Sequence, residues 1–248
     1  MTRVGVSCEG AGVRFLFDRQ RRPVTPMIAR VRFGCSSSWG LRDLDLELRG
    51  GGSVGLVGSN GAGKSTLLRA LAGVLAADEG RIETRGRIGS VLSVSAGLSP
   101  LLTGRENATL VAVLAGLSRR AAKGALPEVK RRSELGPAFE REVASYSQGM
   151  RARLAFASLE TAQPEILLLD EVHEAFDAEF RARLEQFVAE VLAGDGVVVA
   201  AGHDHRALGR LCEQGLWLHE GRRQAIGPFD EVVATYAGGP RDDPVAVT

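Results

Sequence analysis

The sequence predicts an α/β protein that combines a mainly parallel sheet, an antiparallel β subdomain and an inserted helical subdomain. Short apolar runs at residues 53–58, 166–170 and 197–201 have the composition of buried strands and alternate with stretches of helical periodicity. A glycine-rich stretch follows the first of these strands and precedes a helix, a position that suits anion binding. Residues 104–163 are predominantly helical in pattern and interrupt the alternation, which indicates an insertion.

The first part of the chain is expected to form strands around the glycine-rich stretch. Residues 15–38 are basic, contain proline and end in serines, which indicates a loop between strands. This loop is either simply solvated, the plainer interpretation, or a contact for acidic lipid headgroups. Residues 41–48 alternate apolar and charged side chains like a half-exposed strand, and residues 66–75 have helical spacing. Residues 81–94 have the pattern of a small antiparallel hairpin.

Helices and strands continue to alternate after the inserted block. Helices are expected at residues 178–193 and 205–213, on either side of the strand at 197–201, and a hairpin at 216–224. We therefore expect one domain over residues 1–238, with its helical subdomain at about residues 100–163. The remaining residues, 239–248, are expected to be a disordered tail.

Composition and charge exclude several classes of protein. The chain has 248 residues, of which 44% are hydrophobic and 25% charged, as in ordinary globular proteins. A formal net charge of +1 provides no basic surplus, so no nucleic-acid partner is expected. Three widely spaced cysteines without a C-x-x-C pair argue against a disulfide framework or a zinc site. Neither a signal peptide nor a membrane span is visible, so a role at a membrane would require a partner.

Residues 58–65 match the phosphate-loop pattern G-x-x-x-x-G-K-[ST] of P-loop NTPases, between a predicted strand and a predicted helix. The glycines allow successive N–H groups to point at phosphate oxygens, and the helix start adds partial positive charge. Lys64 is expected to reach the β- and γ-phosphates, and the Ser65 hydroxyl to coordinate Mg²⁺. The candidate nucleotide-binding residues are Gly58, Ser59, Asn60, Gly61, Ala62, Gly63, Lys64, Ser65 and Thr66.

Two acidic residues end the buried strand at residues 166–170, where ligands bind in open α/β sheets. Asp170 is expected to hold Mg²⁺, and Glu171 to polarise the water that attacks the nucleotide. His203 follows the next buried strand and is a candidate catalytic contact to the γ-phosphate. The alternative is that His203, like His205, has no role in the site. The remaining candidates are interpreted as structural or surface residues: His173, Glu174 and His219.

Four motifs in this order resemble those of the nucleotide-binding subunit of an ABC transporter. They are G-S-N-G-A-G-K-S-T at 58–66, Y-S-Q-G-M-R-A-R-L-A-F-A at 146–157, I-L-L-L-D-E at 166–171 and G-H-D at 202–204. The resemblance covers about residues 41–236 and implies ATP and Mg²⁺ as cofactors. It also implies an ATPase homodimer bound to an integral membrane permease, at the cytoplasmic face of the cell membrane.

This resemblance implies a role for the turn Ser147–Gln148–Gly149 in nucleotide binding. In the family, two subunits pair head to tail, and the S-x-G turn of each covers the ATP held by the other. Ser147 offers a hydroxyl, Gly149 allows close approach, and a helix start faces the γ-phosphate. The form Y-S-Q-G-M, together with P-L-L-T-G-R-E-N-A at 100–108 and D-A-E-F at 177–180, is similar to the subfamily that exports bacterial surface polysaccharides. That subfamily includes O-antigen, capsule and teichoic-acid exporters.

Several positions depart from the family pattern. The glutamine that usually links Mg²⁺ to the membrane partner is not visible, and Ser93 or Ser95 is the possible substitute. The segment before Asp177 reads H-E-A-F-D, and the adenine-stacking aromatic is either Phe15, Phe17 or Trp39. The chain also ends too early for the carbohydrate-binding domain of some O-antigen subunits, so selectivity for the glycan is expected in the permease.

Other functions stay open at this stage. The same ATPase could energise transport of a lipid or a drug, because no part of the chain is expected to touch cargo. A soluble, non-transport ABC ATPase would usually carry two cassettes, coiled coils or basic extensions, and none is present. Glu171 argues against a non-hydrolysing module, and the S-Q-G-M-R turn argues against an unrelated P-loop kinase.

Overall fold

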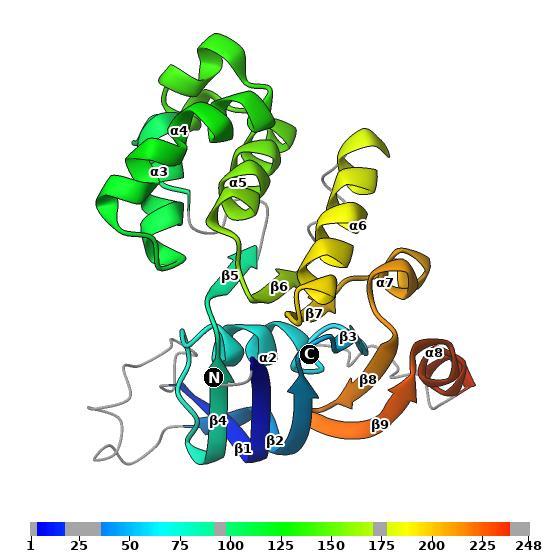
Figure 1. Ribbon diagram of the computed structural model, residues 1–248. Coiled ribbons are helices and arrows are strands. Elements are labelled where there is room, and N and C mark those ends of the chain that lie inside the picture. The colour runs from blue at the N-terminus through cyan, green and yellow to red at the C-terminus, as the bar shows by residue number, and fades with distance from the viewer. Residues whose placement is uncertain (1–3, 18–35, 92–97, 171–177, 239–248) are drawn as a thin grey trace.

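Two sheets form the framework of the chain in the computed structural model, which describes residues 4–17, 36–91, 98–170 and 178–238 (Figure 1). The larger sheet has six strands in the order β5-β6-β7-β3-β8-β9. Its strands are β3 (Ser53–Val57), β5 (Ile88–Val91), β6 (Ile166–Asp170), β7 (Val197–Ala201), β8 (Gln214–His219) and β9 (Arg222–Pro228). Neighbours pair in parallel except β8 and β9, which form the expected hairpin. The mainly parallel α/β sheet predicted from the sequence is therefore confirmed.

The central strands are buried because both faces of the sheet are covered. Every residue of β3, β6 and β7 is buried, as is usual for parallel strands. Alternate side chains of β6 enter different clusters, with Ile166 and Leu168 on one face and Leu167 and Leu169 on the other. The continuous apolar runs in the sequence follow from this two-sided burial.

The smaller sheet is antiparallel and has the order β2-β1-β4. Its strands are β1 (Gly5–Phe17), β2 (Ser36–Arg49) and β4 (Glu79–Arg85). The prediction of a loop over residues 15–38 is wrong at both ends, because residues 15–17 belong to β1 and residues 36–38 to β2. The middle of that segment lies outside the described residues. These two strand ends pair with each other, residues 15–17 with residues 36–38, and composition alone does not reveal such pairing.

The predicted hairpin at residues 81–94 is wrong, because its two halves belong to different sheets. β4 pairs with β1 in the smaller sheet, whereas β5 pairs with β6 in the larger one. The backbone N–H groups of Glu165 and Ile166 both donate to the carbonyl of Arg87, at 2.8 and 2.9 Å, and so join the start of β5 to β6. Gly86, with φ of 141°, makes the turn between the sheets. Alternation predicts a strand but does not identify its partner.

The described helices lie close to where periodicity predicts them, except the last one, at residues 229–238, which was not predicted. They are α2 (Lys64–Leu71), α3 (Gly104–Leu114), α4 (Arg119–Ser133), α5 (Gln148–Ala162), α6 (Ala178–Ala193), α7 (His205–Leu211) and α8 (Phe229–Gly238), with 3₁₀ turns η1 (Gly136–Glu140) and η2 (Val143–Ser145). In Figure 1, α3, α4 and α5 gather beyond the β5 side of the larger sheet. These helices and the residues between them share a hydrophobic cluster of their own. We call residues 98–162 the helical block.

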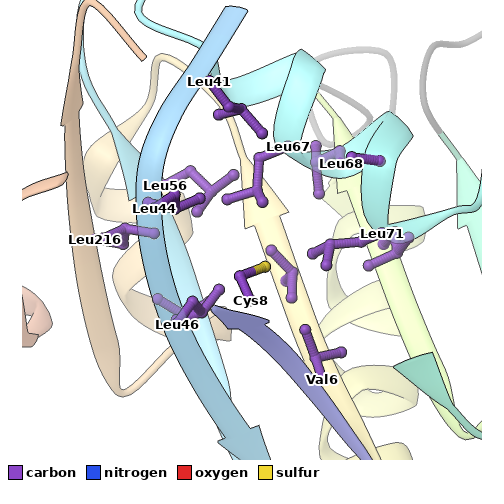
Figure 2. Packing of buried hydrophobic residues seen from close by; sticks show 14 of the residues in the cluster. Val6, Cys8, Leu41, Leu44, Leu46, Leu56, Leu67, Leu68, Leu71 and Leu216 are labelled. Atoms are coloured by element: carbon purple, nitrogen blue, oxygen red, sulfur yellow. The ribbon is translucent and has the colours of Figure 1, made fainter. Parts of the chain in front are cut away.

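A hydrophobic core joins the two sheets through α2. Figure 2 shows Val6 and Cys8 of β1, Leu44 and Leu46 of β2, Leu67, Leu68 and Leu71 of α2, and Leu56 and Leu216 of the larger sheet directed toward one another. Each fully buried leucine stabilises the fold by about 2 kcal/mol. Because α2 begins at Lys64, this packing also fixes the position of the phosphate loop. Among the described residues, no helix has the length and apolarity needed to cross a membrane.

Candidate functional site

The phosphate loop leaves β3 and enters α2 through three glycines with positive φ. The angles are 150° at Gly58, 81° at Gly61 and 111° at Gly63, a region that side chains with a Cβ rarely adopt. At Gly63 a Cβ would also lie only 2.6 Å from the carbonyl oxygen of Gly40. Within the loop, Asn60 and Gly61 are exposed at the tip, whereas Ala62 and Gly63 are buried. Backbone conformation therefore favours glycine at all three positions, and close packing adds to this at Gly58 and Gly63.

Two glycines outside the motif, Gly40 and Gly221, pack closely against the phosphate loop. The backbone N–H of Gly221, in the turn between β8 and β9, donates to the carbonyl of Ala62 at 2.9 Å. A Cβ on Gly221 would lie 2.9 Å from the carbonyl oxygen of Gly40. Sequence reasoning missed both Gly40 and Gly221. The only signal was a glycine inside a strand at position 40, which often marks a close backbone approach.

Lys64 is held against the loop rather than extended into solvent. Lys64 is only 8% exposed, and its Nζ donates to the carbonyl oxygens of Gly58 at 2.6 Å and Ser59 at 3.0 Å. Ser65 and Thr66 follow in the first turn of α2, which contains no acidic residue. The start of α2 thus combines an ammonium group, hydroxyl groups and the partial positive charge of a helix N-terminus, which together favour an anion.

Asp170 lies at the same edge of the larger sheet as the phosphate loop. It is the last residue of β6 and pairs with Ala201 of β7, which in turn pairs with Leu56 of β3. The carboxyl ends of these parallel strands therefore lie together, with about 10 Å between the backbones of β6 and β3. Asp170 is 9% exposed. Glu171, His173 and Glu174 lie outside the described residues.

The two histidines after β7 have different surroundings. His203 is exposed and follows the strand by two residues, at the edge that carries Asp170. His205 is partly buried and its ring packs edge-on against Tyr236, with 5.7 Å between ring centroids. Burial lowers the pKa of His205, and the positive charge of Lys64 lowers it further, so the imidazole is neutral at pH 7. Asp204 accepts hydrogen bonds from two N–H groups at the start of α7, so it caps that helix.

Among the aromatic candidates, Phe15 lies next to the phosphate-loop helix. A Cβ built on Gly40 would meet Phe15 Cε2 at 2.5 Å and Thr66 Cγ2 at 2.9 Å, so both side chains border the same glycine. The ring of Trp39 is instead contacted by the guanidinium groups of Arg14 and Arg42, at 5.6 and 5.7 Å from its centroid. The side chain of Phe17 lies outside the described residues, as do Ser93, Ser95 and Asp177.

The turn Ser147–Gln148–Gly149 caps α5 at a distance from the phosphate loop. Ser147 is the N-cap of α5, and its Oγ accepts a hydrogen bond from the backbone N–H of Met150 at 3.2 Å. Ser147 and Gln148 are exposed, and a Cβ on Gly149 would meet no heavy atom within 4 Å. α5 packs on β5, the edge strand, which is three places from β3 in the sheet. The structure therefore does not bring this turn to the phosphate loop of the same chain.

The stretch from Pro100 to Ala108 is organised by Asn107, whose side chain is fully buried. Its amide oxygen accepts from the N–H of Ser99 at 2.7 Å, and its Nδ2 donates to the carbonyls of Ser99, Leu102 and Thr103. Thr103 and Glu106 form a reciprocal capping box at the start of α3. These bonds explain why polar residues occupy this stretch. They support the fold and are not part of the candidate site.

Comparison with known proteins agrees with this arrangement. Residues 41–174, which include the phosphate loop, the S-x-G turn and Asp170, match the ABC transporter family. The chain belongs to this family. It is therefore an ABC-type, ATP-binding ATPase, and the fold and motifs described above are those of an ABC cassette.

Relatives of this ABC ATPase include export proteins for surface glycans. It is 40% identical over 181 residues to the O-antigen export system ATP-binding protein RfbE of Yersinia enterocolitica, covering 73% of this chain and 76% of that protein. It is 35% identical over 198 residues to the teichoic acids export ATP-binding protein TagH of Lactococcus lactis. This match covers 80% of the present chain but only 42% of TagH.

A solved structure confirms the cassette fold. The ATP-binding cassette MJ0796, determined as a dimer in a post-hydrolysis state bound to ADP and Pi, superposes with a TM-score of 0.73. The match covers 90% of this ABC ATPase and 98% of MJ0796. At 21% sequence identity, the likeness concerns the fold.

Proposed function

We propose that this ABC ATPase drives the export of a bacterial surface polysaccharide or glycoconjugate, such as O-antigen or a teichoic acid. The observation that carries the proposal is its 40% identity to an O-antigen export ATPase over most of both chains. The second relative, named for teichoic acid export, has a different glycan as its named cargo. Glycan export is the property that the two names share.

The nucleotide is assigned to the phosphate loop. Residues 58–66 wrap the phosphates of ATP with backbone N–H groups, and Lys64 exchanges its carbonyl partners for the β- and γ-phosphates. Phe15 stacks on adenine, because it borders the same glycine as Thr66 at the start of α2. Glu171 polarises the attacking water, and His203 contacts the γ-phosphate from the end of β7.

Mg²⁺ is assigned to Ser65 and Asp170, whose oxygen atoms are the ligand type that this ion prefers. Among the described residues, no group of three or more carboxylate, histidine or cysteine side chains could hold a metal ion alone. Mg²⁺ usually binds through one or two protein oxygens together with substrate phosphates and water. When bound, the ion neutralises charge on the transferred phosphate.

The active unit is proposed to be a head-to-tail homodimer. Ser147 and Gln148 are exposed at the start of α5, a helix of 15 residues that packs on the edge strand β5, three places from the strand β3 that leads into its own phosphate loop. A second copy would place this helix start over the first copy's nucleotide, where its N–H groups complement the γ-phosphate. The dimeric state in the name of the MJ0796 structure is consistent with this arrangement.

An integral membrane permease is the proposed second partner, with the ATPase peripheral on the cytoplasmic face of the cell membrane. The names of the relatives, which belong to export systems, support such a partner. The helical block carries three exposed leucines: Leu101 at 80%, Leu110 at 37% and Leu114 at 72% exposure. Leu110 and Leu114 are four residues apart in α3 and so lie on one face of it, and apolar side chains exposed on one face favour a protein contact. We also propose one ABC domain over residues 1–238, with residues 100–163 as its helical subdomain.

The proposal can be tested in the source bacterium with Lys64→Ala introduced into the chromosomal gene. Surface polysaccharide should be lost while the polymer accumulates inside the cell, because synthesis continues and export stops. Lys123→Ala, which changes an exposed lysine of α4, provides the control and should leave surface polysaccharide normal. Normal surface glycan in Lys64→Ala cells would contradict the proposal. Loss of a lipid or of drug tolerance instead would favour transport of another substrate, and an unchanged membrane phenotype would favour a soluble ATPase.

A further inference from the structure

Glu160 of α5 and Arg183 of α6 form a nearly buried ion pair where α4, α5 and α6 meet. The Glu160 side chain is 5% exposed, and that of Arg183 is 24% exposed. Arg183 Nε donates to Glu160 Oε1 at 2.9 Å, and its second terminal nitrogen donates to Glu160 Oε2. Arg183 also donates to the carbonyl oxygen of Arg132, in the last turn of α4, at 2.7 Å. One guanidinium group therefore links three helices.

Aromatic rings fix the plane of this guanidinium group. Arg183 lies 5.6 Å from the ring centroid of Phe156 on α5 and 5.2 Å from that of Phe180 on α6. The rings of Phe156 and Phe180 pack edge to face, with 6.4 Å between centroids. A planar, bidentate contact between aromatic rings requires arginine, since lysine offers neither the paired donors nor the flat surface.

The pair connects the helical block to the core of the protein. α4 and α5 belong to the helical block, whereas α6 packs on β6, β7 and α7. α5 begins at the turn Ser147–Gly149 and ends just before β6, the strand that carries Asp170. Glu160 thus lies near the end of α5 that meets the core, and Arg183 binds it from the core side, next to the apolar contacts of Phe156 and Leu159.

Helix geometry makes the turn sensitive to this contact. Glu160 lies about 20 Å along the axis of α5 from Ser147, at about 1.5 Å per residue. A tilt of about 10° at Glu160 would therefore move the turn by about 3–4 Å. Functional groups must usually be held within about 0.5 Å of their productive positions. Loss of the contact between Arg183 and Glu160 would therefore misplace the turn without disturbing the phosphate loop.

We propose that Arg183 and Glu160 are positioning residues that orient α5 so that the turn Ser147–Gly149 fits the nucleotide of the opposite subunit. This inference depends on the proposed composite site of the homodimer. The pair does not touch ATP, and it acts through α5.

The pair can be tested with Arg183→Met, Glu160→Gln and the double variant. Each should lower kcat by roughly tenfold and weaken ATP-driven dimerisation, while the Kd of the monomer for ATP stays unchanged. The double variant should lose less activity than the sum of the two single losses, because both variants remove the contact between Arg183 and Glu160. The losses overlap only in part, since Glu160 also pairs with Arg132 at 3.5 Å and Arg183 also donates to the Arg132 carbonyl. Arg183→Lys should recover only part of kcat. Dimerisation is measured by size-exclusion chromatography with Mg-ATP in a Glu171→Gln background.

The matched control is Arg210→Met, which removes a surface ion pair between α7 and α6, outside the helical block. Arg210 Nε donates to Glu185 of α6 at 2.6 Å, and both side chains are solvent-exposed. Its kcat should equal that of the unmodified protein. Assays are run well below the melting temperature of every variant, so that lower stability alone does not reduce kcat. Unchanged kcat in Arg183→Met, a parallel loss of ATP affinity, or additive effects in the double variant would overturn the proposal.

Mixed dimers show which half of the site the pair serves. Arg183→Met mixed with Lys64→Ala should recover activity, because both lesions then fall on one composite site and the other stays intact. If the pair instead served its own subunit's nucleotide, each site would carry one lesion and activity would stay low, which overturns the proposal. Ser147→Arg mixed with Lys64→Ala tests the composite site itself. Failure of that mixture, with the changes in kcat and dimerisation intact, would count against the proposed site arrangement rather than against the role of the pair in closure.

Discussion

At the residue scale, the ammonium group of Lys64 is positioned before any nucleotide arrives. Two carbonyls of the phosphate loop hold Nζ, and the packing of α2 against both sheets holds the backbone. Because these carbonyls are neutral acceptors, the ammonium can exchange them for phosphate oxygens of full negative charge. The structure therefore explains how a lysine can be nearly buried and still be available to a ligand.

We expect Lys64→Ala to weaken ATP binding by about a hundredfold, because about 3 kcal/mol of charge-assisted hydrogen bonding is lost. The measurement is a fluorescence titration with an ATP analogue at constant ionic strength. Lys123→Ala on the exposed face of α4 is the control and should bind like the unmodified protein. An unchanged Kd in Lys64→Ala would contradict the assignment of the phosphate loop.

We expect Phe15→Ala to weaken ATP binding by about tenfold and to leave the binding of inorganic tripolyphosphate unchanged. Stacking of a base on an aromatic ring is worth about 1–3 kcal/mol, and tripolyphosphate has no base to stack. Trp39→Ala is the comparison, since that ring already contacts Arg14 and Arg42. The reverse order of effects, measured by competition titration, would assign adenine stacking to Trp39.

At the scale of single elements, the start of α3 depends on one buried amide. Asn107 makes four hydrogen bonds to backbone groups of residues 99–103, and the capping box of Thr103 and Glu106 completes the helix start. Backbone that turns inside a protein needs such partners, because water does not reach it. The start of α3 is thereby held in place, and with it the helix that carries the exposed Leu110 and Leu114.

We expect Asn107→Ala to lower the free energy of unfolding by about 2–4 kcal/mol, because it empties a fully buried side-chain position and removes four hydrogen bonds to partly buried backbone groups. Urea denaturation followed by circular dichroism measures the change. Thr109→Ala on the same helix is the control, since its hydroxyl bonds only to the carbonyl of Arg105 within the helix. Its effect should stay within about 0.5 kcal/mol. Equal effects of the two variants would show that the buried amide has no special role.

At the scale of the whole molecule, the two groups of residues that make up the proposed composite site are far apart within one subunit. The phosphate loop and Asp170 share an edge of the larger sheet, whereas the turn Ser147–Gly149 opens α5 beyond the edge strand β5. A chain that separates two such groups can use both only by pairing with another copy. Activity is then expected to depend on protein concentration.

We expect mixtures of Ser147→Arg and Lys64→Ala to show more ATPase activity than either variant alone. In the mixed dimer both lesions fall on one composite site, and the other site has an unmodified loop and turn. Ser147→Arg alone should bind ATP as a monomer but fail to close, because the added cation occupies the space of the opposite γ-phosphate. Steady-state ATPase assays at several mixing ratios measure the recovery. Loss of ATP binding by the Ser147→Arg monomer would refute the composite arrangement.

The sequence by itself determined the local features of this protein. The buried strands at residues 53–58, 166–170 and 197–201 and the helix at 178–193 follow from apolar runs and periodicity, and the structure confirms them. The phosphate loop is equally local, because its glycines, lysine and serine act within one short turn. Such features depend on residue type and spacing along the chain, both of which the sequence contains in full.

Tertiary structure alone decided which distant segments meet. Residues 81–94 contain two strands as expected, but β4 joins one sheet and β5 the other, since pairing depends on partners far away in the chain. Phe15 and Trp39 are similar candidates in the sequence, and only folding puts Phe15 beside Thr66 and Trp39 beside two arginines. The contact of Arg183 with Glu160 was likewise invisible, because charged residues on separate helices become partners only when the helices pack. Each of these outcomes depends on the burial and hydrogen bonding of the whole fold, which no local pattern contains.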